Sequence, residues 1–517
     1  MNHSMYDIII VGLGPVGLFA ANVFGKAGWK VLAIEQYERR WPYPRAIGMD
    51  DEILRELGAI GLQEKVLDRT HEIKGLQFIH KENEVFYTTA FKSEGFLPKG
   101  PFLYYQPELE EILETGSHRY PNVELLYGCK LEDFEQILDE NEVEVLVKLS
   151  DGSSKKLCCS YLIGCDGANS SVRRKLDIKE KSFGYDGYIL KIDAEAKDLQ
   201  KFTYDTEYAQ KYCSTDMAWV RMLGRDNHCR WEFQFKGEVD DPELISEKQA
   251  LKYIAAIGED VENLHIINVA FYRYRSLVQK EWRKGNCFIA GDAAHLTAPY
   301  IGQGLCAGIR DISNLAWKLG EIRAGKCDEK LMESYRTERS PHISRFIFLA
   351  MIIGWVFKTR FYHLLLAFKY LPFLNTFNQE LDIPPPKLGK GLFDKHKIAR
   401  RMVPYFPLSQ SEEKSCMIDD ICRGKWTLLS MDQEGSQFSA STSEKICERL
   451  DLSSSQEANI HLKKWMNEKN VSWLLIRPDL YIYSAGRTLR ELEKAYKKLQ
   501  HTYQSTSSLT KKKWVHQ

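Results

Sequence analysis

The chain has 517 residues, a length that predicts about two to four domains, because a single hydrophobic core rarely grows so large. Its 71 basic and 71 acidic residues cancel, which argues against nucleic-acid binding and against a general attraction to anionic membranes. The 12 cysteines are scattered without the spacing of a metal site or a redox pair, so we expect reduced thiols and no metal. Because no signal peptide is visible before the first strand, we expect a cytoplasmic protein.

The chain opens with a nucleotide-binding pattern. The unbroken apolar run Ile8 to Val11 is typical of a buried parallel strand, and it ends on Gly-x-Gly-x-x-Gly at Gly12, Gly14 and Gly17. Gly12 permits a tight turn, Gly14 lets the backbone approach a pyrophosphate, and Gly17 lets a helix pack closely against the strand. This spacing predicts a site for the phosphates of a dinucleotide.

The next two elements complete the pattern. Apolar and small residues favour a helix over residues 18–27, and the free N–H groups at its start would bind the phosphates. Residues 30–35 predict a second strand, and Glu35 at its end lies where a carboxylate accepts a hydrogen bond from a ribose hydroxyl. An acid at this position favours FAD or NAD over NADP.

A shaped loop with two prolines and a glycine follows over residues 39–51. Arg45 lies just beyond the predicted pyrophosphate site, so we interpret it as a phosphate contact rather than an exposed loop charge. Asp50 is placed to cap a helix over residues 53–57, and as an acid close to the cofactor it is also a candidate base.

A second phosphate-side turn is predicted further along the chain. Residues 72–105 alternate apolar and polar side chains, which is typical of antiparallel strands, and Pro107 suits the first turn of a helix. The apolar strand 161–163 leads to Asp166 and Gly167, which precede a serine-capped basic helix. A strand that runs into Asp-Gly and then a helix indicates a second contact with the cofactor.

The middle of the chain predicts an antiparallel sheet. Residues 184–274 mostly alternate and are rich in aromatic side chains, as expected for a sheet with one solvated face. Trp231 and Phe233 lie in this region. We interpret them either as core residues or as the wall of a substrate pocket, and the sequence does not decide between the two.

A third turn follows the buried strand expected over residues 282–290. It begins with Gly291 and Asp292, continues through a Pro/Gly loop over residues 298–305, and leads into a helix over residues 306–322. Asp292 comes directly after an apolar strand and before that loop. Its position favours a contact with the cofactor over a simple helix-capping role.

Residues 346–357 are the most hydrophobic run. The run is shorter than the roughly twenty residues that a membrane span needs, so we expect a buried helix. The alternative is an interfacial helix with peripheral membrane contact, supported by a second apolar stretch at residues 361–374. Residues 383–391 are typical of a linker, and the remainder alternates strands and helices up to a polar tail from residue 505.

Taken in this order, the three turns resemble those of the class A flavoprotein monooxygenases, the single-component aromatic hydroxylases with the p-hydroxybenzoate hydroxylase fold. The segments 44–52, 230–233 and 302–304 look closest to the 3-(3-hydroxyphenyl)propionate hydroxylase branch. The resemblance covers about residues 5–400. It implies an α/β fold: a Rossmann-like FAD-binding domain with an inserted antiparallel-sheet substrate domain and a small C-terminal thioredoxin-like α/β domain, here without redox cysteines.

The resemblance also implies domain boundaries. We expect the FAD-binding domain over 1–75, 105–182 and 280–345, the substrate domain over 76–104 and 183–279, an apolar helical segment and linker over 346–395, the thioredoxin-like domain over 396–504, and a tail over 505–517.

Residue roles follow from the same resemblance. The ADP half of FAD would be held by Gly12, Gly14, Gly17 and Glu35, and FAD would be contacted near the pyrophosphate and ribityl chain by Arg45 and Gln106. Asp166 with Gly167 would place FAD and shape the path of the nicotinamide cofactor. The ribityl chain would be reached by Gly291 and Asp292, and the isoalloxazine would lie against Pro299, Gly302, Gly304 and Leu305.

The implied reaction is hydroxylation of a phenolic or other aromatic small molecule. NADPH or NADH would reduce FAD, and O2 would form a flavin C4a-hydroperoxide that attacks the ring. His295, Tyr300 and Asp50 are the candidates for the base that deprotonates a phenol. The rival functions are an FAD-dependent reductase, dehydrogenase or epoxidase acting on an apolar lipid-like substrate. A flavin halogenase is disfavoured because its Trp-x-Trp-x-Ile-Pro motif is missing, and a homodimer is left open.

Overall fold

The computed structural model describes residues 5–79, 85–90, 102–137, 141–198, 210–213, 219–223, 227–235, 246–358, 386–411, 414–431, 447–452 and 459–504. The chain divides into two compact units, each described by itself below. The first comprises Met1–Ser93, Pro98–Ile312 and Ile343–Ile383, and the second comprises Glu94–Leu97, Ser313–His342 and Pro384–Gln517. The elements within them confirm the predicted mixed α/β fold.

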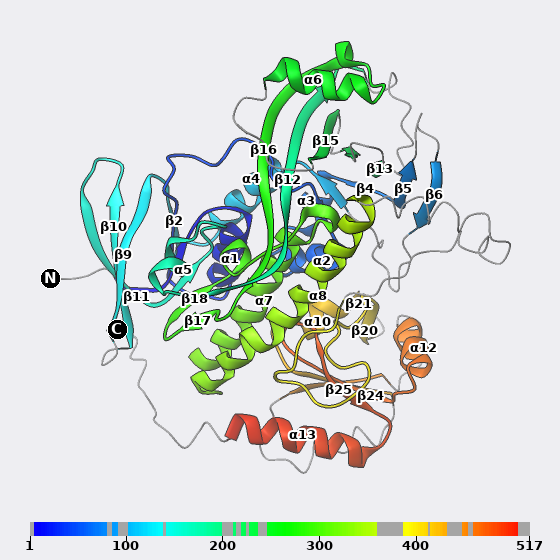
Figure 1. Ribbon diagram of the computed structural model, residues 1–517. Coiled ribbons are helices and arrows are strands. Elements are labelled where there is room, and N and C mark those ends of the chain that lie inside the picture. The colour runs from blue at the N-terminus through cyan, green and yellow to red at the C-terminus, as the bar shows by residue number, and fades with distance from the viewer. Residues whose placement is uncertain are drawn as a thin grey trace. The chain divides into compact units, whose positions relative to one another are not determined.

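The first sheet of the first unit carries the three turns at which the sequence predicts the nucleotide site. Its strands run in the order β17-β18-β11-β1-β2-β8, and all but β17 are parallel. Their bounds are β1 Met5–Val11, β2 Val31–Ile34, β8 Val123–Leu126, β11 Ser154–Gly164 and β18 Cys287–Ile289. Because neighbouring parallel strands end at the same edge, the turns after β1, β11 and β18 lie side by side (Figure 1).

Helices and a hairpin extend this sheet. Helix α1 (Pro15–Lys26) follows β1, and the hairpin β9 (Cys129–Ile137) and β10 (Glu142–Leu149) pairs with β11. One expectation is wrong. Residues 282–290 do not form one strand, because Gly285, with φ +56°, turns the chain between β17 (Arg283–Lys284) and the antiparallel β18.

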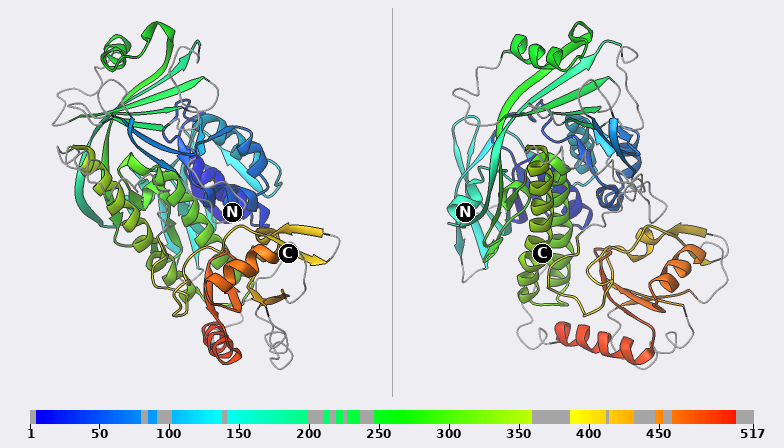
Figure 2. Two further views of the ribbon diagram at one scale, coloured as in Figure 1. Left: turned by 90° about the vertical axis from the view of Figure 1, so that its right-hand side faces the viewer. Right: turned by 45° about the vertical axis from the view of Figure 1, so that its right-hand side comes forward.

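The second sheet of this unit is mostly antiparallel, in the order β19-β16-β12-β15-β14-β13-β5-β6. Its strands are β5 Gly75–Ile79, β6 Val85–Ala90, β12 Glu180–Ala196, β13 Gln210–Cys213, β14 Trp219–Leu223, β15 His228–Phe235, β16 Leu264–Gln279 and β19 His295–Leu296. Strands β12 and β16 are long neighbours, and helix α6 (Glu247–Ala256) lies across one end of the sheet (Figure 2). Since β19 belongs to the third turn, this sheet is hydrogen-bonded directly to the turn that follows β18.

A small sheet and three helices complete the surroundings of the site. The sheet is β3 (Gly48–Met49), β7 (Phe102–Tyr104) and β4 (Thr70–Glu72), in that order. The helices are α2 Asp51–Ala59, α3 Gln63–Leu67 and α4 Gln106–Ser117, and α5 (Ser171–Lys175) follows the second turn. Asp50 caps α2 as predicted, since its side chain accepts a hydrogen bond from the backbone N–H of Ile53.

The apolar run 346–357 lies in the second half of α8 (Glu333–Lys358) and is buried on one side only. Phe346, Ile347 and Ala350 are buried, whereas Phe348, Ile352 and Trp355 are exposed. The expectation of a buried helix therefore holds for part of the run only, because three of its large apolar side chains are exposed. Residues 361–374 and 505–517 lie outside the described part of the chain. Within the described part, no helix combines the length and apolarity that crossing a membrane would require.

The second unit contains a four-stranded sheet in the order β23-β22-β24-β25 and the hairpin β20–β21. Its strands are β20 Pro407–Ser411, β21 Lys414–Met417, β22 Thr427–Ser430, β23 Glu448–Asp451, β24 Trp473–Ile476 and β25 Ile482–Gly486, and its helices are α10 Ile418–Cys422, α12 Ile460–Glu468 and α13 Leu489–Gln504. Helix α7 (Gln303–Arg323) and helix α8 each contribute one segment to this unit, because the boundary between the units falls inside both helices.

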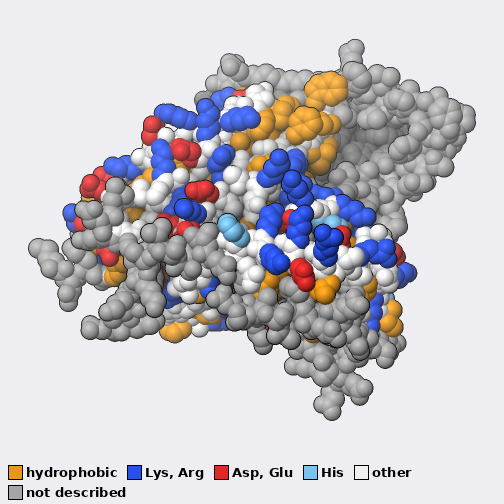
Figure 3. Space-filling view, turned by 90° about the horizontal axis from the view of Figure 1, so that it is seen from below, with side chains coloured by type: hydrophobic (Ala, Val, Ile, Leu, Met, Phe, Trp, Pro, Cys, Tyr) orange, Lys and Arg blue, Asp and Glu red, His pale blue; other side chains and the backbone are white. Residues whose placement is uncertain are grey.

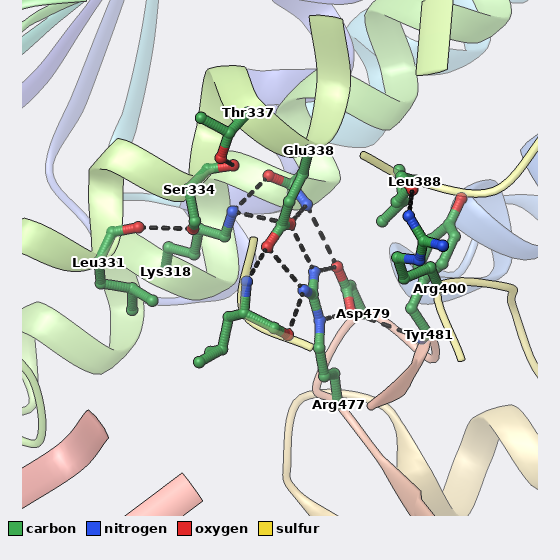
Figure 4. A network of polar contacts seen from close by, with 12 residues as sticks. Lys318, Leu331, Ser334, Thr337, Glu338, Leu388, Arg400, Arg477, Asp479 and Tyr481 are labelled. Carbon is green, nitrogen blue, oxygen red and sulfur yellow. Dashed lines mark hydrogen bonds and ion pairs between the residues drawn. The ribbon is translucent and has the colours of Figure 1, made fainter. Parts of the chain in front are cut away.

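A buried charge cluster joins these helical segments to the sheet within the second unit (Figure 4). The Glu338 carboxylate accepts hydrogen bonds from Arg477 at 3.0 and 3.1 Å and from Lys318 Nζ at 3.0 Å, and Arg477 also pairs with Asp479. All four side chains are almost inaccessible to solvent. Burial by itself raises the pKa of Glu338, but the charges of Arg477 and Lys318 outweigh burial and lower it to about 2.

Replacing Arg477 should therefore destabilise the second unit. Arg477→Ala leaves two buried carboxylates without their main partner, so we expect the free energy of unfolding to fall by about 3–5 kcal/mol, measured by urea denaturation. Lys498→Ala is the control, because Lys498 is half exposed where it meets Asp394 at 3.1 Å, and it should cost about 1 kcal/mol or less. Equal losses in the two variants would contradict the importance of the buried cluster.

Candidate functional site

The first turn shows which glycines the fold itself requires. Gly12 has φ +100°, and a Cβ there would lie 2.6 Å from the carbonyl oxygen of Cys165. A Cβ on Gly17 would overlap the carbonyl oxygen of Gly12. A Cβ on Gly14, in contrast, would meet no protein atom within 4 Å. Packing of the protein therefore explains Gly12 and Gly17, whereas Gly14 leaves open space beside the start of α1.

The start of α1 suits an anion. Gly14 is its N-cap and no side chain caps the helix, so its first backbone N–H groups keep their capacity to bind an anion. Glu35, at the end of β2, accepts hydrogen bonds from the N–H groups of Leu13 at 3.0 Å and Tyr37 at 3.2 Å. The carboxylate is thus fixed beside the glycine turn, where the sequence places a ribose.

The second turn is built around Asp166. Its Oδ2 accepts hydrogen bonds from Ser171 N at 2.6 Å, Ser171 Oγ at 2.8 Å and Val172 N at 3.1 Å, which caps α5. Its Oδ1 is buried and has no hydrogen-bond partner among the described residues. A buried acceptor without a partner is costly, so this atom is suited to a ligand or a water.

The third turn is held by Asp311 of α7. Asp311 Oδ2 accepts a hydrogen bond from Gly291 N at 3.1 Å and lies 2.7 Å from His295 Nε2. His295 is fully buried, and its ring packs against Trp282. Asp292 is exposed, yet enough protein surrounds it for desolvation to raise its pKa, partly offset by His295 and Arg45.

A buried arginine fixes the loop that continues the third turn. Arg310 on α7 pairs with Asp50 at 2.7 Å and Glu52 at 2.6 Å, and it donates to Gln303 Oε1 at 3.0 Å. Gln303 Nε2 also donates to Asp50 Oδ2 at 2.9 Å. Asp50 is therefore a paired carboxylate that ties the start of α2 to the loop around Gly302.

A hydrogen-bond chain fixes the backbone of the Arg45 loop from one side. Gln106 Oε1 accepts from Arg45 N at 2.9 Å and Ala46 N at 2.6 Å, while Gln106 Nε2 donates to Glu110 Oε1 at 2.6 Å. Burial raises the pKa of Glu110 to about 7, although this hydrogen bond and the charges of Arg40 and Arg45 act in the opposite direction.

A second buried charge cluster holds the same loop from the opposite sheet. Arg230 donates to the carbonyl oxygens of Arg45 at 2.9 Å and Pro44 at 3.2 Å, and Lys191 also donates to Pro44. Asp193 pairs with Arg230 at 2.7 Å, with Lys191 at 3.2 Å and with His228 at 3.0 Å. Burial lowers the pKa of His228, which keeps this imidazole neutral at neutral pH, and Asp193 carries the negative charge.

Three tyrosines lie where the third turn meets the second sheet and α8. The hydroxyls of Tyr274 and Tyr300 are 2.9 Å apart, and the Tyr185 ring packs against both. Burial and the neighbouring tyrosines raise the pKa of Tyr300, so its hydroxyl stays protonated at neutral pH. A Cβ on Gly354 would overlap Tyr300 and Tyr185, which means that this glycine lets α8 approach the cluster.

Comparison with known families identifies the domain that contains these turns. A family model described as an FAD binding domain matches residues 5–349 and therefore covers all three turns. The chain belongs to this FAD binding domain family. The prediction of an FAD-binding domain is thereby confirmed.

Relatives of known function resemble the chain over most of its length. The 3-(3-hydroxy-phenyl)propionate/3-hydroxycinnamic acid hydroxylase of Shigella sonnei (strain Ss046) is 29% identical over 354 residues, which are 68% of this chain and 62% of that protein. The enzyme of the same name from Comamonas testosteroni is 28% identical over 400 residues, 75% of this chain and 66% of that protein. The match thus spans less than two thirds of these relatives. They confirm the resemblance to this hydroxylase branch.

Solved structures support the fold. Aklavinone-11 hydroxylase, solved with FAD and aklavinone, superposes with a TM-score of 0.78 at 20% identity and covers 98% of this chain and all of its own. OxyS anhydrotetracycline hydroxylase from Streptomyces rimosus gives a TM-score of 0.73 at 22% identity, with the same coverage. At these identities the likeness concerns the fold alone.

The structure brings most of the predicted cofactor residues to the adjacent turns of the first unit. Two candidate pocket residues and one candidate base lie away from an accessible surface. Trp231 and Phe233 are fully buried in a hydrophobic cluster with Leu190 and Ile192, which favours core packing over a pocket wall. His295 is equally buried behind the third turn, with its Nε2 next to Asp311.

Sequence reasoning missed the buried residues that hold the turns, namely Lys191, Asp193, Arg230, Arg310 and Asp311. Lys191 and Asp193 alternate with apolar neighbours on β12, a pattern that predicts a solvated face. The structure instead buries that face against the Pro44 carbonyl. The one available signal was Arg230, which belongs to a segment used for the family resemblance.

The open space beside Gly14 yields a test of the FAD site. In Gly14→Ala the new methyl group meets no protein, so we expect unchanged stability of the apoprotein but at least about tenfold weaker FAD binding, a loss of about 1.4 kcal/mol. FAD titration followed by flavin fluorescence measures this change. Gly320→Ala, also without a neighbour within 4 Å, is the control and should bind FAD normally. Normal affinity in Gly14→Ala would contradict the placement of the pyrophosphate.

The raised pKa of Glu110 predicts that the stability of the folded protein depends on pH. Its pKa is about 7 in the folded protein and about 4.5 in the unfolded chain, so only the folded state holds the proton between these values. The contribution of Glu110 to the free energy of unfolding is therefore fully present at pH 4.5. It falls by up to about 3 kcal/mol as the pH rises to 7.

Glu110→Gln keeps an acceptor for Gln106 without the charge, so it should match the wild type at pH 5 and exceed it in unfolding free energy at pH 8. Urea denaturation at the two pH values measures the difference. Glu111→Gln, on the exposed side of the same helix, is the control and should show no such pH dependence. A Glu110→Gln effect independent of pH would show that Glu110 is ionised throughout.

Proposed function

We propose that the protein is an FAD-dependent monooxygenase that consumes NADPH or NADH and O2 and hydroxylates a phenolic aromatic small molecule in the cytoplasm. The observation that carries this proposal is the convergence of three distant turns at one sheet edge in an FAD binding domain family member. The hydroxylase names of the relatives support the reaction class.

The residues present fit FAD. The uncapped start of α1, the open side of Gly14 and the fixed Glu35 carboxylate suit its ADP half. The unpartnered Asp166 Oδ1 and the exposed Asp292 are acceptors for the rest of the cofactor. When bound, FAD supplies the redox and oxygen-activating chemistry that amino-acid side chains lack.

The three candidate bases take different roles in this proposal. Asp50 is paired with Arg310, and His295 is buried against Asp311. Both therefore act as positioning residues for the Pro/Gly loop over residues 298–305, which we call the flavin loop. Tyr300 lies on that loop and shares a hydrogen bond with Tyr274. Its protonated hydroxyl orients a substrate phenol as donor or acceptor, and the Tyr274 hydroxyl next to it provides the next position for a proton.

The surrounding chain excludes water from the reaction. The tyrosine cluster packs with Ile189, Ala298 and Ala350, and α8 closes on it at Gly354. A water-poor environment is required because reduced flavin that meets water and oxygen releases hydrogen peroxide instead of hydroxylating a substrate.

The second unit has a separate part in the proposal. We assign it a thioredoxin-like fold because its mixed sheet of β22–β25 carries helices α12 and α13. Its described cysteines, Cys327, Cys416, Cys422 and Cys447, form no disulfide with one another. The domain is therefore structural in this proposal rather than a redox partner.

The second candidate function is an FAD-dependent reductase or dehydrogenase acting on an apolar, lipid-like substrate. The exposed apolar side chains of α8 favour it over other rivals. Isotopic labelling separates the two, because a monooxygenase transfers one atom of O2 to its product and a dehydrogenase transfers none.

Turnover with labelled dioxygen tests the proposed function. We expect NAD(P)H oxidation to increase when a phenolic acid is added, and mass spectrometry to find one labelled oxygen atom in the product. Asp292→Ala should lose the yellow colour or at least about 90% of this turnover, because an exposed acceptor of the flavin is removed.

Asp151→Ala, in the exposed hairpin between β10 and β11, is the control and should keep both colour and turnover. A product whose new oxygen comes from water would exclude the monooxygenase reaction while leaving the FAD site intact. Normal colour and turnover in Asp292→Ala would remove Asp292 from the site.

A further inference from the structure

Helix α8 has two different apolar sides in the first unit. One side packs inward: Ala350 and Ile353 join the cluster around Tyr300, and Gly354 allows the close approach. The other side carries Phe348, Ile352 and Trp355, which are 60%, 44% and 48% exposed. Spacings of four and three residues place these three side chains on one face of the helix. We call them the α8 apolar face.

Among the described residues, the α8 apolar face is the one helix face with more than one exposed large hydrophobic side chain. In the part of the chain that the structure describes, the other exposed large hydrophobic side chains are Met5, Tyr37, Trp41, Tyr43 and Ile460. Tyr37, Trp41 and Tyr43 are in ring contact in the loop after β2, and none of the five shares a helix face with another. Figure 3 shows one area of the surface where hydrophobic side chains gather beside Lys and Arg side chains. Apolar groups concentrated in this way mark an interaction surface more often than scattered ones do.

The charges along the sequence indicate the kind of partner. The chain is neutral as a whole, but it contains no Asp or Glu between Glu338 and Glu380. The basic residues in that interval include Arg345, which is exposed one turn before Phe348, and Lys358, which is the last residue of α8. An acid-free segment with basic residues at both ends of an apolar face is complementary to an anionic surface that has an apolar interior.

These observations favour a lipid surface over a second protein copy. Phe and Trp on one face, flanked by cations, are the side chains that insert into the headgroup region of a bilayer. The helix is not able to cross a membrane, so contact would be confined to one leaflet. A second copy would bring an equally basic segment against the first, and the like charges would repel.

We propose that the α8 apolar face binds the interface of a membrane that contains anionic lipid. Because the opposite side of the same helix contacts the tyrosine cluster, this contact would place the site next to compounds dissolved in the bilayer. The substrate class it implies, an apolar aromatic compound, rests on the proposed function. Binding to lipid itself does not depend on that function.

Vesicle binding by the full-length protein, without substrate, tests the proposal. We expect co-sedimentation with phosphatidylcholine vesicles that contain about one third phosphatidylglycerol, weaker binding to pure phosphatidylcholine, and weaker binding at high salt. The triple variant Phe348→Ser, Ile352→Ser, Trp355→Ser should lose at least about tenfold in affinity. The matched control is Ile460→Ser, which removes a side chain that is 52% exposed on α12 and should bind as the wild type does.

Three results would overturn the proposal. They are no binding of the wild type to the anionic vesicles, equal binding of the triple variant, and a wild-type dimer that the triple variant dissociates without any vesicle binding. Light scattering after gel filtration detects the last case. Retained FAD colour shows that the triple variant is folded, and a protein that binds vesicles but hydroxylates nothing would contradict only the proposed function.

Discussion

The parallel pairing of β11 with β1 and β18 is the constraint on which the site depends. Parallel strands bring their carboxyl ends to one edge, so segments more than a hundred residues apart deliver Gly12, Asp166 and Gly291 to adjacent positions. Hydrogen bonds between the turns continue the pairing beyond the strands, from Cys165 N to the Val11 carbonyl and from Ala290 N to the Gly164 carbonyl. The arrangement of the three turns at the proposed FAD site is therefore a consequence of strand order.

Buried charges then fix the loops that the sheet cannot reach. Pro44 and Arg45 lie before the short strand β3, and their carbonyl groups accept hydrogen bonds from Arg230 and Lys191, both of which pair with Asp193. Such clusters stabilise little on balance, because desolvation offsets most of the Coulomb attraction. Their value lies in specificity, since any other position of the loop would leave a charge buried without its partner.

Helix α8 contacts the tyrosine cluster with one side and solvent with the other. Its inner side reaches the tyrosine cluster because Gly354 has no side chain, and its outer side presents the α8 apolar face. One helix thus contributes to the dry surroundings of the flavin loop and to the proposed contact with lipid. Packing on the inner side, together with the proposed lipid contact on the outer side, would account for an apolar run without a polar side.

The sequence by itself determined the nucleotide turns, the family and the course of most strands and helices, because those depend on local patterns: glycines at fixed spacing, apolar periodicity and an Asp50 cap. Only the tertiary structure decided which side chains are buried around the site. Lys191 and Asp193 look like a solvated strand face, and Trp231 fits either a pocket or a core, since period alone does not show what packs against a face. Partners such as Asp311 for His295 are set by the fold, not by neighbours in the chain.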